Sequence, residues 1–92
     1  MRKPSQYIAK GWCQGMSAQE VSGESCNAND SNAMSWCLIG SLQAAYPTRD
    51  EAFEKVVNKL VKKLDTIALA KWNDDPKRTQ AEVIELLQSI GE

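Results

Sequence analysis

The sequence predicts a mostly α-helical fold, a small helical bundle of three main helices preceded by a short N-terminal helix. Apolar residues recur at helical spacing over long segments, and two Thr-x-x-Glu capping boxes mark helix starts at Thr48 and Thr79. The length of 92 residues suits one small core, and no linker divides the chain. We therefore expect a single helical domain over residues 1–92.

The short first helix is expected over Ser5 to Lys10. Three consecutive residues in its middle, Tyr7 to Ala9, are apolar, and Gly11 follows its last position. A glycine at that place can adopt the left-handed conformation that ends many helices.

A polar segment follows between Gly15 and Asp30 and is rich in Gly, Ser, Asn and Glu. Its Val-Ser-Gly-Glu sequence at residues 21–24 fits a two-residue turn between two short strands and favours a minor β-hairpin near residues 18–26. Ser17 and Glu20 also have the spacing of a capping box, which favours a helical turn instead. The sequence leaves these two alternatives open.

The second helix is expected over Ser31 to Tyr46, where apolar residues cover nearly every face of a helix. Such a helix belongs at the centre of a bundle. Gly40 and Ser41 lie in its middle, where a glycine costs about 1 kcal/mol relative to alanine. This cost predicts that another backbone packs closely against the helix there, most simply at a helix crossing.

The third helix is expected to begin at the Thr48 capping box and carries the clearest amphipathic pattern, from Phe53 to Ile67. Its opposite face gathers lysines 55, 59, 62 and 63. A solvated face explains these lysines, and an anion-binding strip is the alternative.

The last helix is expected to run from the Thr79 capping box to Gly91. Before it, residues Trp72 to Pro76 have the composition of a turn. The chain thus ends in a turn followed by an amphipathic helix.

Composition argues against several function classes. Eleven Lys and Arg residues stand against twelve Asp and Glu residues, and the net charge of −1 disfavours general nucleic-acid binding. The absence of histidine removes the commonest general base and the commonest transition-metal ligand, so we expect no enzyme. Three cysteines without a CxxC spacing do not supply a zinc site, and no cofactor is indicated.

The cysteines also predict a cytoplasmic location. Cys13, Cys26 and Cys37 are odd in number, which favours reduced thiols over a disulfide framework. The N-terminus continues into polar residues rather than an apolar signal core, and no apolar run approaches the length that spans a bilayer. We therefore expect no membrane association.

The three tryptophans all stand beside polar residues, as Trp12-Cys-Gln, Trp36-Cys and Trp72-Asn-Asp. Each indole N–H needs a partner when it is buried. Packing in the core and a stacking pocket for a planar ligand are both consistent with this pattern.

The segment from residue 72 to 79, Trp-Asn-Asp-Asp-Pro-Lys-Arg-Thr, concentrates donors, acceptors and a helix cap. An aspartate can pair with Arg78 across the turn, Asn73 can form an Asx turn, and the helix start at Thr79 offers amides to an anion. A rigid structural corner and a corner that binds phosphate or carboxylate are the two interpretations. The candidate ligand-binding residues are Trp12, Gln14, Trp36, Trp72, Asn73, Asp74, Arg78 and Thr79.

The motifs Gly-Trp-Cys-Gln-Gly at residues 11–15, Trp-Cys-Leu-x-Gly at 36–40 and Trp-Asn-Asp-x-Pro-x-Arg-Thr at 72–79 resemble those of small uncharacterised bacterial and phage proteins, a domain of unknown function. The resemblance spans nearly the whole chain. It implies one helical domain in which the tryptophan motifs and the corner form one unit, and it carries over no catalytic residue.

These observations lead to a non-enzymatic binding protein as the expected function. Its partner would be a protein or a small anionic, nucleotide-like ligand, and the resemblance implies an accessory role in a phage or other mobile element. The alternative is a structural or oligomerisation module that forms a homodimer through apolar helix faces.

Overall fold

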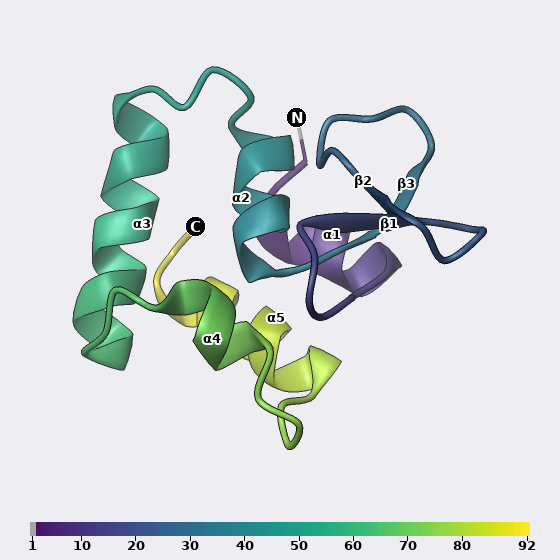
Figure 1. Ribbon diagram of the computed structural model, residues 1–92. Coiled ribbons are helices and arrows are strands. Elements are labelled where there is room, and N and C mark those ends of the chain that lie inside the picture. Colours follow the sequence, from purple (N-terminus) through teal and green to yellow (C-terminus); the bar gives the residue numbers. More distant parts are fainter. Residues whose placement is uncertain (1) are drawn as a thin grey trace.

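The computed structural model describes residues 2–92. They form five helices and a three-stranded antiparallel sheet, and 48% of the residues are helical (Figure 1). The predicted bundle of three main helices is therefore wrong. The elements are α1 (Pro4–Lys10), β1 (Ala18–Glu20), β2 (Ser25–Cys26), β3 (Ala33–Trp36), α2 (Leu38–Ala45), α3 (Glu51–Leu64), α4 (Leu69–Asn73) and α5 (Gln80–Ser89).

The largest difference from the prediction lies in residues 31–46, where a strand and a shorter helix replace one long helix. The Trp36 N–H donates to the Gly11 carbonyl at 2.9 Å, and the Cys13 N–H donates to the Trp36 carbonyl at 3.2 Å. The Cys37 sulfur then accepts the Gly40 N–H at 3.2 Å and caps α2. A short buried strand followed by a helix can give the same nearly continuous apolar pattern as one buried helix. Periodicity alone therefore could not distinguish the two in this segment.

The predicted hairpin is present, although its turn has three residues and not the predicted two, and the competing helical turn is wrong. β1 pairs with β2 in the register Ala18 to Cys26, and the Glu20 N–H donates to the Glu24 carbonyl at 2.9 Å. Gly23 has a φ of +93°, the left-handed conformation that a three-residue hairpin turn requires. β3 adds to the other side of β1, which gives the strand order β2-β1-β3.

A β-bulge interrupts the pairing of β1 with β3. Gln19 lies opposite Ser35 and Glu20 lies opposite Ala33, so Met34 is an extra residue on β3. A bulge of this kind changes the direction of a side chain. Met34 is 44% exposed.

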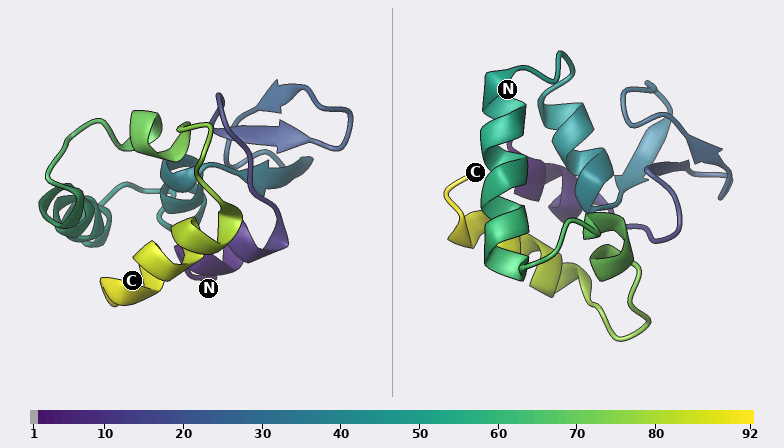
Figure 2. Two further views of the ribbon diagram at one scale, coloured as in Figure 1. Left: turned by 90° about the horizontal axis from the view of Figure 1, so that it is seen from below. Right: turned by 60° about the vertical axis from the view of Figure 1, so that its left-hand side comes forward.

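α1 forms as expected and packs one face against α2, α5 and β3, with Ile8 fully buried and Gln6, Ala9 and Lys10 exposed (Figure 2). Gly11 does not end it with a left-handed residue, because its φ of −177° is extended. A Cβ at Gly11 would overlap the Met34 carbonyl oxygen, so the position needs a glycine for close approach. The Glu92 carboxylate accepts the Ser5 N–H at 2.7 Å and the Ser5 hydroxyl, which holds the last residue to the start of α1.

α3 is the predicted amphipathic helix, at the side of the molecule opposite the sheet (Figure 1). Asp50, and not Thr48, caps it: one Asp50 carboxylate oxygen accepts the N–H groups of Ala52 at 3.2 Å and Phe53 at 3.4 Å. Arg49 has a φ of 50°, and α3 begins at Glu51, so Thr48 lies two residues before the actual N-cap.

α4 replaces the first half of the turn expected at residues 72–76, because Trp72 and Asn73 are its last two residues. The Thr79 capping box is confirmed. The Thr79 hydroxyl accepts the Glu82 N–H at 3.2 Å, and the Glu82 carboxylate accepts the Thr79 N–H at 3.1 Å. No helix within residues 2–92 is both long and apolar enough to cross a membrane.

The close approach predicted at Gly40 is confirmed, although the neighbour is not a helix. A Cβ at this position would overlap the carbonyl oxygen of Ser17, in the segment that leads into β1. The same carbonyl accepts the Cys37 N–H at 3.1 Å. The start of α2 and the start of β1 are thereby held in direct backbone contact.

Candidate functional site

The Asn73 side chain is the centre of the polar network that joins the predicted site residues. It is fully buried, and its carbonyl oxygen accepts the Trp12 indole N–H at 2.8 Å and the Leu38 backbone N–H at 3.0 Å. Its amide nitrogen donates to the Cys13 carbonyl at 3.2 Å and to the Asp74 carboxylate at 3.0 Å. Both acceptor positions and both donors of the amide are thus used.

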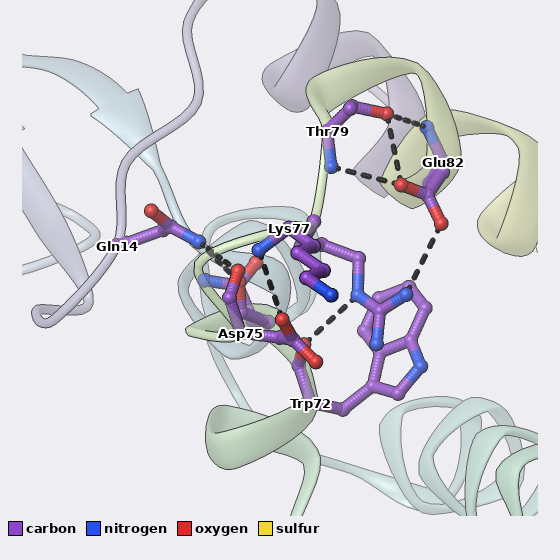
Figure 3. Close-up of polar contacts among 8 residues, drawn as sticks. Gln14, Trp72, Asp75, Lys77, Thr79 and Glu82 are labelled. Atoms are coloured by element: carbon purple, nitrogen blue, oxygen red, sulfur yellow. Dashed lines mark hydrogen bonds and ion pairs between the residues drawn. The ribbon is translucent and has the colours of Figure 1, made fainter.

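Gln14 ties the loop after α1 to the end of α4. Its side-chain amide donates to the carbonyls of Asn73 at 3.0 Å and Asp75 at 2.9 Å (Figure 3). The Gly15 N–H donates to the Asp74 carboxylate at 2.9 Å. The Asn73 carbonyl at the end of α4 has no intrahelical donor, so Gln14 satisfies it, whereas the Asp75 carbonyl also accepts the Arg78 N–H at 2.9 Å.

Arg78 folds back over α4. Its guanidinium carbon lies 3.7 Å from the centre of the Trp72 indole, and Nε donates to the Trp72 carbonyl at 2.9 Å (Figure 3). Its Nη1 lies 3.1 Å from the Glu82 carboxylate. The pairing of Arg78 with an aspartate across the turn is therefore wrong, because Asp74 accepts from Gly15 and Asp75 accepts the Lys77 N–H at 2.9 Å.

Trp36 has a different set of partners from the other candidate residues. Its indole N–H donates to the Ala28 carbonyl at 3.0 Å, and its ring meets the edge of Tyr7 at 5.0 Å. Its backbone forms an isolated parallel β-bridge with that of Trp12. The remaining candidates, Trp12, Gln14, Trp72, Asn73, Asp74, Arg78 and Thr79, form one connected set, which we call the corner.

The polar atoms of the corner bind one another. Within residues 2–92, no buried side-chain nitrogen or oxygen lacks a hydrogen-bond partner. The Glu82 carboxylate accepts a hydrogen bond at the start of α5, where the ligand-binding interpretation placed an anion. A hydrogen-bond network of this kind fixes the relative positions of the loop, α2, α4 and α5.

Replacement of Arg78 tests how the corner is held. Arg78→Ala removes the indole contact, the Nε hydrogen bond and the Glu82 pair, and we expect a loss of about 1–2 kcal/mol in the free energy of unfolding. Arg78→Lys should recover less than half of that loss, because an ammonium group lacks the planar stack and the Nε donor. Chemical denaturation measures both values, and full recovery by lysine would show that charge alone matters.

The cysteines are free thiols, and two of them are buried. Burial raises the pKa of Cys13 to about 11, and burial also raises the pKa of Cys37. Both side chains are therefore neutral thiols near pH 7 and poor nucleophiles. Within the described residues, no group of three or more Cys, Asp or Glu side chains is arranged to hold a metal ion.

A second constellation, which the sequence did not reveal, surrounds a hollow of about 230 Å³ between α1 and the loop joining β2 to β3. The Arg2 guanidinium lies 5.9 Å from the centre of the Tyr7 ring, and the Lys10 ammonium lies 5.8 Å from the Trp36 ring. We call this the Tyr7 hollow; the side chains that matter below are Arg2, Tyr7, Lys10, Asn29, Asp30 and Trp36.

Comparison with known proteins identifies the family. Residues 2–91 match a family described as "Family of unknown function (DUF6197)". The chain belongs to this family. No curated protein and no solved structure matches the sequence.

The DUF6197 match confirms the resemblance to a family of unknown function, while the bacterial or phage origin stays a prediction. Because the match covers residues 2–91, the corner and the Tyr7 hollow both lie within the family domain. Only the spacing of Tyr7 and Lys10 along α1 could have pointed to the hollow, since its opposite wall comes from a loop some twenty residues later.

Proposed function

We propose that this protein is a non-enzymatic binding protein that takes a small anionic, nucleotide-like ligand in the Tyr7 hollow. The observation that supports this proposal is the pair of cations at its rim. Arg2 and Lys10 each lie over an aromatic ring, and neither forms an ion pair within residues 2–92. Two cations that face one hollow without a carboxylate partner suit a phosphate group.

The opposite wall favours a nucleotide over a bare phosphate. Asp30 uses one carboxylate oxygen to accept the Asn32 N–H at 2.8 Å, and no hydrogen bond within residues 2–92 occupies the other. A carboxylate is a common acceptor for ribose hydroxyls, and it would repel a second phosphate. The ligand would therefore place its anionic end at Arg2 and Lys10 and its hydroxyl or amino groups at Asn29 and Asp30.

The aromatic residues would contribute apolar contact more than stacking. Trp36 is only 4% exposed and Tyr7 is half-buried, so only a small part of each ring is accessible from the hollow. The hollow is open and smaller than most ligand pockets. At about 0.3 kcal/mol per ligand atom, a mononucleotide should bind with Kd on the order of 10–100 µM.

Thermal melting with inorganic phosphate, nucleoside monophosphates and cyclic dinucleotides tests the proposal. A nucleotide at about ten times its Kd should stabilise the protein by about 1.4 kcal/mol and raise Tm by about 6–10 °C. Arg2→Ala with Lys10→Ala should abolish the shift. The matched control, Lys71→Ala with Lys77→Ala, removes the same charge from exposed positions outside the hollow and should keep it.

Three results would contradict this function. A flat panel on the wild-type protein would exclude the ligand class. An equal loss in the control variant would mean unspecific attraction of anions to the whole surface. A response to phosphate as large as that to nucleotides would remove the role of Asn29 and Asp30.

We infer that this binding takes place in the cytoplasm as part of an accessory function in a bacterium or phage. The cytoplasmic location is supported by the three free cysteines, since unpaired thiols are typical of proteins in reducing surroundings. The accessory role is supported by the resemblance of the motifs alone. In that role the protein would sequester a nucleotide signal.

A further inference from the structure

Among residues 2–92, two of the three exposed large apolar side chains lie together at one end of the sheet. Val21 is 86% exposed and Met34 is 44% exposed, and both line one hollow of about 390 Å³ with Glu20, Ser22, Ser31 and Asn32. We call this surface the sheet tip. The third exposed apolar residue, Ile67, is 87% exposed and lies between α3 and α4. We propose that the sheet tip docks a basic, apolar segment of a partner protein.

The fold exposes both side chains through irregular features of the sheet. Val21 is the first residue of the three-residue hairpin turn, and Met34 is the extra residue of the β-bulge. Bulges occur at sheet edges, where they redirect a side chain away from the regular alternation. A flexible thioether adapts its shape to a partner, so methionine is frequent on recognition surfaces.

Charge identifies the kind of partner. Residues 11–48, which include the whole sheet, contain three acidic side chains, Glu20, Glu24 and Asp30, and no lysine or arginine. Glu20 lines the sheet tip itself. A carboxylate beside an apolar centre attracts positively charged partners and disfavours acidic ones. A partner segment in which lysine or arginine flanks an apolar side chain therefore fits this surface. The apolar side chain would lie between Val21 and Met34.

The docking surface is independent of the nucleotide proposal. Val21 and Met34 do not line the Tyr7 hollow, and neither Arg2 nor Lys10 lines the sheet tip. Ser31 lies at both, on the loop between β2 and β3 that separates them. Either site can therefore fail its test without affecting the other.

Three fluorescent ten-residue peptides serve as probes: alternating Lys and Leu, alternating Lys and Ser, and alternating Glu and Leu. Anisotropy should show binding of the Lys/Leu peptide, binding about tenfold weaker for Lys/Ser, and none for Glu/Leu. The double variant Val21→Ser with Met34→Ser should lower the affinity for the Lys/Leu peptide about tenfold. The matched control Ile67→Ser should leave that affinity unchanged. Glu20→Gln should weaken it severalfold at low salt and less at high salt.

Sedimentation and NMR complete the test. The wild-type protein should sediment as a monomer, and the Lys/Leu peptide should shift the Met34 methyl and Val21 amide signals, a readout that needs no variant. The proposal would be overturned if the Glu/Leu peptide bound, or if Ile67→Ser lost as much affinity for the Lys/Leu peptide as the double variant. It would also be overturned if that peptide shifted NMR signals outside the sheet tip instead. So would a wild-type dimer that Val21→Ser with Met34→Ser dissociates, because a second copy would then occupy the surface.

Discussion

Asn73→Ala should lower the free energy of unfolding by about 3–5 kcal/mol, out of a total of about 5–14 kcal/mol for a domain of this length. The substitution leaves the Leu38 N–H, the Cys13 carbonyl and the Trp12 indole N–H without their partner. Each buried group left unpaired costs about 1–3 kcal/mol. Urea denaturation followed by tryptophan fluorescence measures the loss, and a change below about 1 kcal/mol would contradict the central role of this amide.

Asn73→Asp provides a matched variant of nearly the same shape. Its oxygens still accept from Trp12 and Leu38, but a carboxylate would face the Cys13 carbonyl and the Asp74 carboxylate. A proton would restore one donor, so the folded variant binds a proton more tightly than the unfolded chain. We expect its stability deficit relative to wild type to shrink as pH falls from 7 to 4. A deficit independent of pH would mean that the lost donor is unimportant.

Gly40→Ala should destabilise the protein by about 2–4 kcal/mol. Glycine to alanine inside a helix normally stabilises it by about 1 kcal/mol. Here the new methyl group overlaps the Ser17 carbonyl, so either α2 or the segment before β1 must move. Because Ser17 also accepts the Cys37 N–H, that movement weakens the cap of α2.

Gly91→Ala is the control that separates this overlap from the general effect of losing a glycine. Gly91 has a φ of +68° and no neighbouring atom near the position of a Cβ. Its replacement should cost only about 1–2 kcal/mol, from the left-handed conformation alone. Thermal or urea denaturation of both variants gives the comparison, and equal costs would show that the contact with Ser17 can relax.

Local signals in the sequence predicted several elements correctly. α3 has a one-sided apolar pattern, α5 has the Thr79 capping box, and the hairpin has a glycine at the position that needs one. Each signal acts within a few residues, so no knowledge of the tertiary fold was required. β3 depends instead on pairing with Gly11 to Cys13 and with β1, and this long-range pairing overrode the helical pattern of residues 33–37.

The candidate site was predictable as a set of residues but not as a network. The sequence pointed to Trp12, Gln14 and the segment from Trp72 to Thr79 because their side chains are polar or aromatic. Asn73 was assigned a local Asx turn, whereas its four partners include residues 35 to 61 positions away. The Tyr7 hollow was missed for the same reason, since two separate segments form its walls.

The position of α1 has a consequence for synthesis on the ribosome. Ile8 is fully buried, its carbonyl accepts the Gln80 side chain at 2.7 Å, and α1 packs against α5. Because α1 precedes α5 along the chain, α1 cannot complete its packing until α5 has left the exit tunnel. We expect the nascent chain to stay protease-sensitive until α5 emerges, with no stable folded intermediate before that point.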